Sequence, residues 1–366
     1  MNKPIRILHI VTYMGRGGLE SMLMNYYRNI DRSKVQFDFL VHRDFKADYD
    51  DEILSLGGKI YHISRLVPWS KTYKNELKSF FNNHPEYQII HVHQDCLSAV
   101  ALKCAKECGI PVRVAHAHSS SAVKNFKYPI KLHYMKKIYK YATDLFACGK
   151  QAGDWMFTGH DYTIVKNAID LDKYKLSSEM AKETKKQFHI EDKYVIGHVG
   201  CFREEKNHIF LVDVFNEVRK MHSDSVLLLV GDGEKQEEIK QKVKELGLEN
   251  DVIFTGSRAD VNLLMQAMDV FVFPSLYEGL GMVFIEAQAS GLHCIVSDSV
   301  PSESILLPEL VCVKSLNDSV KSWAEEVLNR KKISDLNFSN LVRSGYDIKK
   351  ECRKLEEFYL NSIQKR

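Results

Sequence analysis

Short runs rich in Ile and Val alternate with longer amphipathic stretches along almost the whole chain, and this alternation restricts the possible folds most strongly. Strands of parallel sheets are apolar on both faces because helices cover both sides and separate the strands along the chain. The alternation therefore predicts an α/β fold with parallel sheets. Strands are expected at 5–11, 37–41, 59–63, 89–93, 112–116, 145–148 and 163–165, and in a second α/β unit at 194–199, 226–230, 252–255, 270–273, 294–297 and 310–313.

The length of 366 residues indicates two domains, because it exceeds what one compact core normally holds. Hydrophobic residues make up 45% of the chain and charged residues 27%, which excludes a disordered or fibrous protein. A strand gives way to the polar, lysine-rich segment 173–186 near Asn167–Asp170. We therefore predict domains at 1–170 and 171–345, with a C-terminal helix at 346–366 that packs back toward the first domain.

The chain has no obvious membrane-spanning or secretory segment. No apolar run approaches the ~20 residues needed to cross a bilayer, and the run at 5–11 is too short for a signal peptide. We therefore expect a cytosolic protein. Its eight cysteines form no C-x-x-C pair and are expected as reduced, small core residues. Cys104 and Cys108 could share a metal, but buried thiols are the more common outcome.

Positive charge is concentrated in the first half of the chain. Residues 1–170 hold 24 Lys plus Arg against 16 Asp plus Glu, although the net charge of the whole chain is only +3. Segment 109–143 has no acid, and its basic residues are Arg113, Lys124, Lys127, Lys131, Lys136, Lys137 and Lys140. These residues predict one strongly positive face on the first domain.

Segment 128–143 can be drawn as one amphipathic helix. Its apolar side would hold Ile130, Tyr134, Ile138 and Tyr141, and its basic side Lys136, Lys137 and Lys140. An ordinary surface helix and a helix that docks on anionic lipid both fit this pattern. Nucleic acid is not expected as a partner, because no aromatic stacking platform or helix-turn-helix pattern accompanies the charge.

Three loops that follow predicted strands contain residues suited to binding a ligand, which is where open α/β sheets bind their ligands. The first contains Gly15, Gly17 and Gly18, whose backbone could approach a phosphate at a helix N-terminus. Glu20 occupies the position where the dinucleotide pattern G-x-G-x-x-G needs its last glycine, so a plain tight turn fits equally well.

The second loop, G-C-F-R-E-E-K-N at 200–207, presents Arg203 and Lys206. Two close cations suit a diphosphate. The alternative is that Glu204 and Glu205 neutralise them on a solvated turn.

The third loop begins the stretch E-G-L-G-M-V-F-I-E at 278–286. Glu278 precedes a helix predicted at 282–290, and Glu286 lies inside that helix among apolar residues. A buried carboxylate needs hydrogen-bond donors, which vicinal sugar hydroxyls would supply. A nucleoside diphosphate sugar has its parts in a matching order. Its ribose would lie at Glu286, its phosphates on the amides at 279–282 and its hexose at Glu278.

Several ordered motifs together resemble the retaining glycosyltransferases of family 4. They are G-G-L-E at 17–20, H-A-H at 116–118, N-A-I-D at 167–170, the 200–207 loop, V-G-D-G at 230–233, F-T-G-S-R-A-D-V at 254–261 and P-S-L-Y-E-G-L-G-M-V-F-I-E-A-Q-A-S-G at 274–291. The resemblance implies the GT-B fold, which has two facing Rossmann-like domains with parallel sheets and a central cleft. It is strongest to the subgroup that builds bacterial capsular polysaccharides and exopolysaccharides.

The resemblance also implies a hexosyltransferase-type enzyme, with an acceptor-side first domain and a second domain that binds the nucleotide sugar. The catalytic residues would be His118, Arg203, Lys206 and Glu278. Donor-binding residues would be Gly17, Gly18, Ser257, Arg258, Gly279, Leu280, Gly281, Met282 and Glu286. Leu292-His293 departs from the family pattern, which commonly has a proline there.

The resemblance further implies retention of anomeric configuration without a divalent metal or other cofactor. The co-substrate would be a UDP-sugar and the acceptor a lipid-linked saccharide at the cytoplasmic face of the inner membrane. The pairs His91-x-His93 and His116-x-His118 could bind a metal, but apart from Asp95 no carboxylate accompanies them, so none is expected. Of these four histidines, His118 matches the acceptor-side histidine of the family, and the others are expected to be structural.

Two other classes of protein remain open. A nucleotide-sugar epimerase of the same architecture would convert its donor without an acceptor. A non-catalytic protein that binds sugar nucleotides would transfer nothing.

Overall fold

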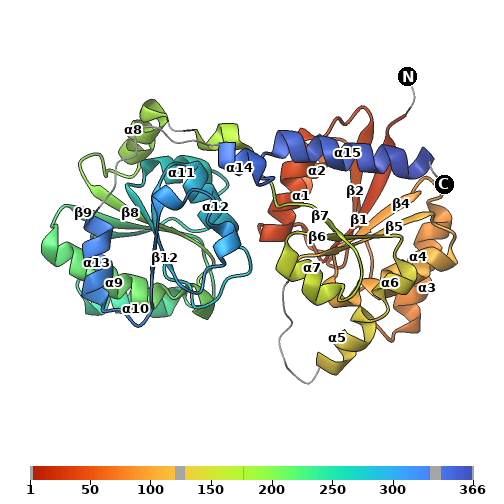
Figure 1. Cartoon of the computed structure of the whole chain (residues 1–366), viewed down its shortest axis with the longest axis horizontal. Coiled ribbons are helices and arrows are strands. Elements are labelled where there is room, and N and C mark those ends of the chain that lie inside the picture. Colours follow the sequence, from red (N-terminus) through yellow and green to blue (C-terminus); the bar gives the residue numbers. More distant parts are fainter. Residues whose placement is uncertain (1–2, 120–127, 176, 330–338, 365–366) are drawn as a thin grey trace. The chain divides into compact units, whose positions relative to one another are not determined.

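Two separate parallel sheets organise the chain in the computed structural model, which describes residues 3–119, 128–175, 177–329 and 339–364 (Figure 1). All thirteen strands expected from the sequence are present, which confirms the α/β prediction. The chain divides into two compact units: unit 1 comprises residues 1–169 and 345–366, and unit 2 comprises residues 170–344.

Unit 1 contains a seven-stranded sheet in the order β3-β2-β1-β4-β5-β6-β7. Its strands are β1 (Ile5–Ile10), β2 (Val35–Val41), β3 (Ile60–His62), β4 (Ile89–Val92), β5 (Val112–Ala117), β6 (Asp144–Ala147) and β7 (Thr163–Ile164). Its helices are α1 (Gly18–Asn29), α2 (Asp50–Ser55), α3 (Lys71–Asn83), α4 (Ser98–Glu107), α5 (Tyr128–Met135), α6 (Ile138–Tyr141), α7 (Lys150–Met156) and α15 (Ile348–Gln364).

Alternate residues along the strands of unit 1 supply two apolar layers, one on each face of the sheet. Leu8 and Ile10 of β1 pack with α3 and α4, whereas Ile7 packs on the opposite face with α1 and α15. Helix α15, blue in Figure 1, contacts α1, and the Cys352 thiol donates to the Tyr26 carbonyl at 3.5 Å. The last helix of the chain therefore belongs to the core of unit 1.

Unit 2 contains a six-stranded parallel sheet in the order β10-β9-β8-β11-β12-β13. Its strands are β8 (Tyr194–Val199), β9 (Ser225–Val230), β10 (Val252–Phe254), β11 (Val270–Phe273), β12 (His293–Ser297) and β13 (Val311–Lys314). Its helices are α8 (Ser178–Gln187), α9 (His208–Met221), α10 (Gln236–Glu245), α11 (Val261–Ala267), α12 (Met282–Ala289), α13 (Val320–Leu328) and α14 (Ser339–Arg343).

The order of strands reverses once in each sheet, between β1 and β4 in unit 1 and between β8 and β11 in unit 2. Crossovers leave the switch point in opposite directions, so the loops after its two strands diverge and leave room for a ligand. In unit 2 the loops after β8 and β11 are the 200–207 and 274–281 segments singled out by their sequence.

The prediction of one amphipathic helix at 128–143 is wrong. The chain turns at Lys136 and Lys137, so α5 and α6 are separate helices. Tyr134, Ile138 and Tyr141 pack against the core of unit 1, because this removes their apolar surface from water. Of the expected apolar side, only Ile130 is exposed. Lys124 and Lys127 lie outside the described residues.

The expectation for the cysteines is correct for five of them, but Cys201 is exposed and Cys108 and Cys312 are half-buried. Among the residues described, no helix combines the length and the apolar character needed to span a membrane.

Candidate active site

The loops after β8 and β11 are joined by direct hydrogen bonds. The Leu276 backbone N–H donates to the Glu205 carbonyl at 2.8 Å, and the Asn207 side-chain amide donates to the Pro274 carbonyl at 3.1 Å. These bonds hold together two motifs about 70 residues apart in sequence, so Arg203, Lys206 and Glu278 belong to one site at the switch point of unit 2.

Lys206 and Glu278 form an ion pair within this site. The Ser275 hydroxyl donates to the same Glu278 oxygen, Oε1, at 3.0 Å, and the Lys206 ammonium lies 4.8 Å from the centre of the Phe273 ring. Only 21% of the Lys206 side chain and 8% of the Glu278 side chain are exposed. Removing one partner of such a sheltered pair leaves the other charge poorly compensated.

The alternative that Glu204 and Glu205 neutralise the two cations of the loop is not supported. Glu204 pairs with Lys235 at 3.2 Å. Within the described parts of the chain, Arg203 is exposed and forms no ion pair. Its guanidinium is therefore available to an anion.

Two glycines of the V-G-D-G motif pack closely against the backbone of the 200–207 loop. A Cβ on Gly231, whose φ is +137°, would lie 2.1 Å from the Gly200 carbonyl oxygen, and a Cβ on Gly233 would lie 2.6 Å from that of Phe202. The Phe202 N–H also donates to the Asp232 carbonyl at 2.7 Å. Close backbone packing explains why glycine is required at these two positions.

Helix α12 begins where the 274–281 loop ends. Gly281 precedes it in the left-handed region at a φ of +69°. The predicted donor-binding residues 279–282 thus surround the N-terminus of an apolar helix, where unpaired N–H groups and the helix dipole favour an anion.

Glu286 lies in α12 and is half-buried. Burial raises the pKa of its carboxyl to about 7, and a hydrogen bond with the Tyr174 side chain opposes that rise. The sequence reasoning missed Tyr174, which lies in a 3-10 turn at Leu171–Tyr174, far from the E-x-7-E stretch along the chain. A carboxyl that titrates near neutrality is common in functional sites.

Ser257 and Arg258 follow β10 at the same edge of the sheet. The Gly231 N–H donates to the Gly256 carbonyl at 2.9 Å and ties this segment to the V-G-D-G motif. Asp260 accepts from Arg258 at 2.8 and 2.6 Å, whereas Ser257 is exposed. The guanidinium of Arg258 is therefore already engaged by a carboxylate.

The other predicted site residues, Gly17, Gly18 and His118, belong to unit 1. Gly17 caps α1, and a Cβ there would lie 2.2 Å from a Glu20 carboxylate oxygen, whereas Gly18 has open space around it. Burial raises the pKa of the Glu20 carboxyl. His118 follows β5, and its backbone N–H donates to Asp95 at 3.3 Å.

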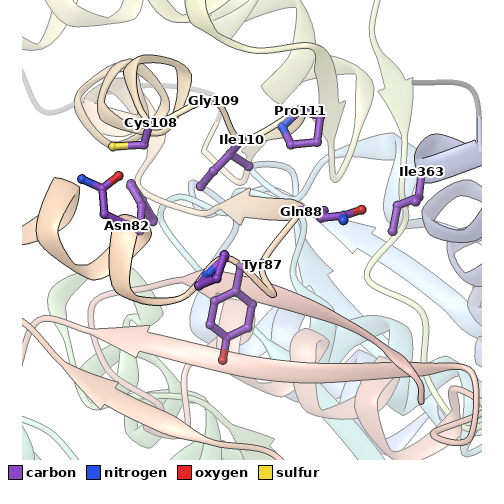
Figure 2. Close-up of a pocket in the computed structure, with 10 residues that line it drawn as sticks. Asn82, Tyr87, Gln88, Cys108, Gly109, Ile110, Pro111 and Ile363 are labelled. Atoms are coloured by element: carbon purple, nitrogen blue, oxygen red, sulfur yellow. The ribbon is translucent and has the colours of Figure 1, made fainter. Parts of the chain in front are cut away.

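Figure 2 shows a pocket elsewhere in unit 1, where Gln88 and Pro111 precede β4 and β5. It therefore lies at the opposite edge of the sheet from His118 and contains none of the predicted site residues. Its lining comes from α3, α15 and the loops between them and includes no charged side chain, so it is not the candidate active site.

Together, the two parallel-sheet units and the cationic loop beside a helix N-terminus are typical of α/β proteins that bind phosphate-containing ligands. Comparisons with known proteins are more specific. The family described as Glycosyltransferase Family 4 matches residues 16–173, and the family described as Glycosyl transferases group 1 matches residues 179–334.

Three relatives are named as glycosyltransferases. EpsF of Bacillus subtilis (strain 168) is 35% identical over 98% of this chain and 97% of its own length. The Escherichia coli UDP-Gal:alpha-D-GlcNAc-diphosphoundecaprenol alpha-1,3-galactosyltransferase is 25% identical over 76% of each chain. The capsular polysaccharide biosynthesis glycosyltransferase CapH of Staphylococcus aureus is 23% identical over 98% of this chain and 99% of its own.

Among solved structures, Anabaena Alr3699/HepE in complex with UDP matches with a TM-score of 0.73 and 17% identity over 98% of this chain and 96% of that one. This likeness confirms the predicted GT-B fold class. The chain belongs to glycosyltransferase family 4, in the group with capsular and exopolysaccharide enzymes, and is a hexosyltransferase-type enzyme.

Proposed function

We propose that this enzyme transfers a hexose from a UDP-sugar to a lipid-linked saccharide with retention of anomeric configuration. The observation that carries the proposal is the Lys206–Glu278 pair, which lies at a switch point beside the N-terminus of α12 and in the same unit as the titratable Glu286. A cation, a helix N-terminus and two acids match the diphosphate and the two sugar rings of such a donor.

Arg203 and Lys206 would bind the diphosphate and stabilise the negative charge that grows on it as the leaving group departs. Glu278 would accept hydrogen bonds from hexose hydroxyls, and Glu286 from ribose hydroxyls. The bond between the anomeric carbon and the diphosphate oxygen breaks while the acceptor oxygen bonds to the same face of the sugar. The acceptor proton passes to an oxygen of the departing phosphate, so no protein nucleophile or metal takes part.

The nature of the acceptor is suggested by the name of the Escherichia coli relative, whose acceptor is a sugar linked through diphosphate to undecaprenol. HepE complexes with UDP and with UDP-glucose suggest the uridine nucleotide in the same way. The first domain would bind the acceptor, and the product would enter capsule or exopolysaccharide synthesis.

Incubation with UDP-hexoses and an undecaprenyl-diphosphate-linked saccharide tests this function directly. We expect mass spectrometry to show an acceptor one hexose heavier, both with and without a chelator such as EDTA. Omitting the acceptor should leave the donor intact. Release of a free or epimerised sugar without acceptor would favour the epimerase instead, and a strict requirement for Mn²⁺ or Mg²⁺ would contradict the metal-free mechanism.

We also propose that unit 1 docks on the cytoplasmic membrane surface through Lys136 and Lys140, which are exposed. Replacing both by glutamine should weaken binding to vesicles that contain anionic lipid by roughly 1 kcal/mol per lysine. Cosedimentation measures this, with Lys240→Gln/Lys244→Gln in unit 2 as the matched control. Equal loss in both double variants, or none in either, would rule out a dedicated membrane face.

A further inference from the structure

Five histidines lie on one face of three neighbouring strands in unit 1. The register pairs His9 of β1 with His91 of β4, and His91 with Val114 of β5. Because alternate strand residues share a face, His93, His116 and His118 fall on the same face as His9 and His91. This face also carries the apolar layer that packs with α15.

These five rings pack against one another, and their hydrogen bonds form two separate rows. In the first row, His9 Nδ1 lies 3.0 Å from His93 Nε2, and His93 Nδ1 lies 2.8 Å from His118 Nε2. Each step moves one strand across the sheet and toward its carboxyl edge. The second row joins Tyr359 and His116 through His91, with contacts of 2.7 and 3.1 Å.

Burial keeps the first row neutral. It lowers the pKa of His9 and of His118 to about 3, and that of His93 well below its usual value. Each neutral imidazole has one N–H and one lone pair, so all hydrogen bonds of the row must point the same way. The tautomer of one ring therefore dictates the tautomers of the other two.

The position of the proton on His9, at the buried end of the row, sets the direction of the hydrogen bonds. His9 Nε2 has no hydrogen-bond partner in the described parts of the chain, and the nearest ring to His9 is Phe37, with centroids 4.3 Å apart and a tilt of 58°. The negative face of a phenyl ring attracts an N–H and repels a lone pair, so an Nε2 that faces Phe37 would carry the proton. A proton on His9 Nε2 makes its Nδ1 the acceptor for His93 and, in turn, His93 Nδ1 the acceptor for His118.

We propose that His93 and His9 are positioning residues that hold His118 as its Nε2–H tautomer, so that its Nδ1 presents a lone pair to a hydroxyl of the bound substrate. His118 Nδ1 has no partner among the residues described. The hydrogen bond between a substrate hydroxyl and His118 Nδ1 rests on the proposed transferase function. The direction of the hydrogen bonds within the row does not depend on that function.

The same rings could be considered as metal ligands, since ring nitrogens of His93, His116 and His118 lie within 4.8 Å of one another. Both nitrogens of His93 are already used in hydrogen bonds to His9 and His118. A metal bound through His93 would have to break that row, so the geometry favours the hydrogen-bonded arrangement.

Nitrogen NMR of the full chain, labelled in its histidine rings, tests the row without substrate. We expect a pyrrole-type signal at Nε2 and a pyridine-type signal at Nδ1 of His9, His93 and His118. In His93→Phe, which keeps a ring but removes both nitrogens, the His118 signals should move toward averaged values. A pyrrole-type Nδ1 in wild-type His118, or unchanged His118 signals in the variant, would overturn the proposal.

Kinetics of the same variants test the link to transfer. His93→Phe should lower kcat roughly tenfold, the scale of one lost hydrogen bond, with a smaller change in the donor KM. His9→Phe serves as a second variant if His93→Phe does not fold. Tyr359→Phe is the control, because it removes an equally buried polar group from the other row and should leave the His118 signals and kcat unchanged.

An equal fall in kcat for Tyr359→Phe would show that general disturbance of the core is responsible, and would overturn the positioning role. If wild-type protein transferred no hexose at all, the proposed function would fail. The nitrogen spectra would still decide whether the row sets the tautomer of His118.

Discussion

Lys206→Ala is expected to lower kcat by roughly 100-fold to 1,000-fold, because it removes the positive charge that, in the proposed mechanism, stabilises the leaving group. In the free enzyme the Lys206 ammonium is paired with Glu278 and lies against Phe273. A donor diphosphate would share this cation. Rates measured at saturating donor and acceptor, with a thermal-shift check of folding, test the expectation.

Two further variants separate the role of the cation from damage to the site. Lys206→Ala leaves the sheltered Glu278 carboxylate without its partner, so Lys206→Ala/Glu278→Gln removes that stray charge as well. Restored activity in the double variant would contradict the diphosphate role. Lys235→Ala is the matched control. Lys235 forms ion pairs with Glu204 of the same loop and with Glu238, and neither is a predicted donor-binding residue.

Glu286→Gln is expected to weaken UDP-sugar binding by ~1–3 kcal/mol above pH 7, the scale of leaving hydrogen-bonding groups poorly matched. The wild-type affinity should itself depend on pH, because only an ionised carboxylate could accept from both hydroxyls of the proposed ribose. With a pKa of about 7 in the free enzyme, affinity should rise as pH increases toward 7 and level off above it. Calorimetry from pH 5.5 to 8.5 measures both effects.

The stability of the free enzyme should show the opposite trend. Burial raises the Glu286 pKa above its unfolded value of about 4.5, so folding favours the protonated form. The stabilising contribution is complete below about pH 4.5 and is lost as pH rises through about 7. Glu286→Gln should flatten both profiles, whereas the exposed control Glu309→Gln should not. A pH-independent affinity in the wild type would contradict the ribose assignment.

Local patterns determined much of the fold because hydrophobic periodicity depends only on nearby residues. All thirteen strands could be placed from their Ile- and Val-rich runs, and the helix expected at 282–290 is α12 at Met282–Ala289. The ordered motifs likewise identified the family that the comparisons show. The same reasoning failed at 128–143, where the pattern was amphipathic but gave no sign of the turn at Lys136 and Lys137.

Strand periodicity and loop composition are encoded within short segments, so the parallel α/β framework and the residue types of the candidate site could be inferred from the sequence. Which of those residues come into contact is visible only in the folded chain. Three contacts depend on strand order and register. They are the pairing of Lys206 with Glu278, the hydrogen bond of Tyr174 to Glu286 and the row from His9 to His118. Those contacts join segments distant along the chain, and no local pattern of residues specifies them.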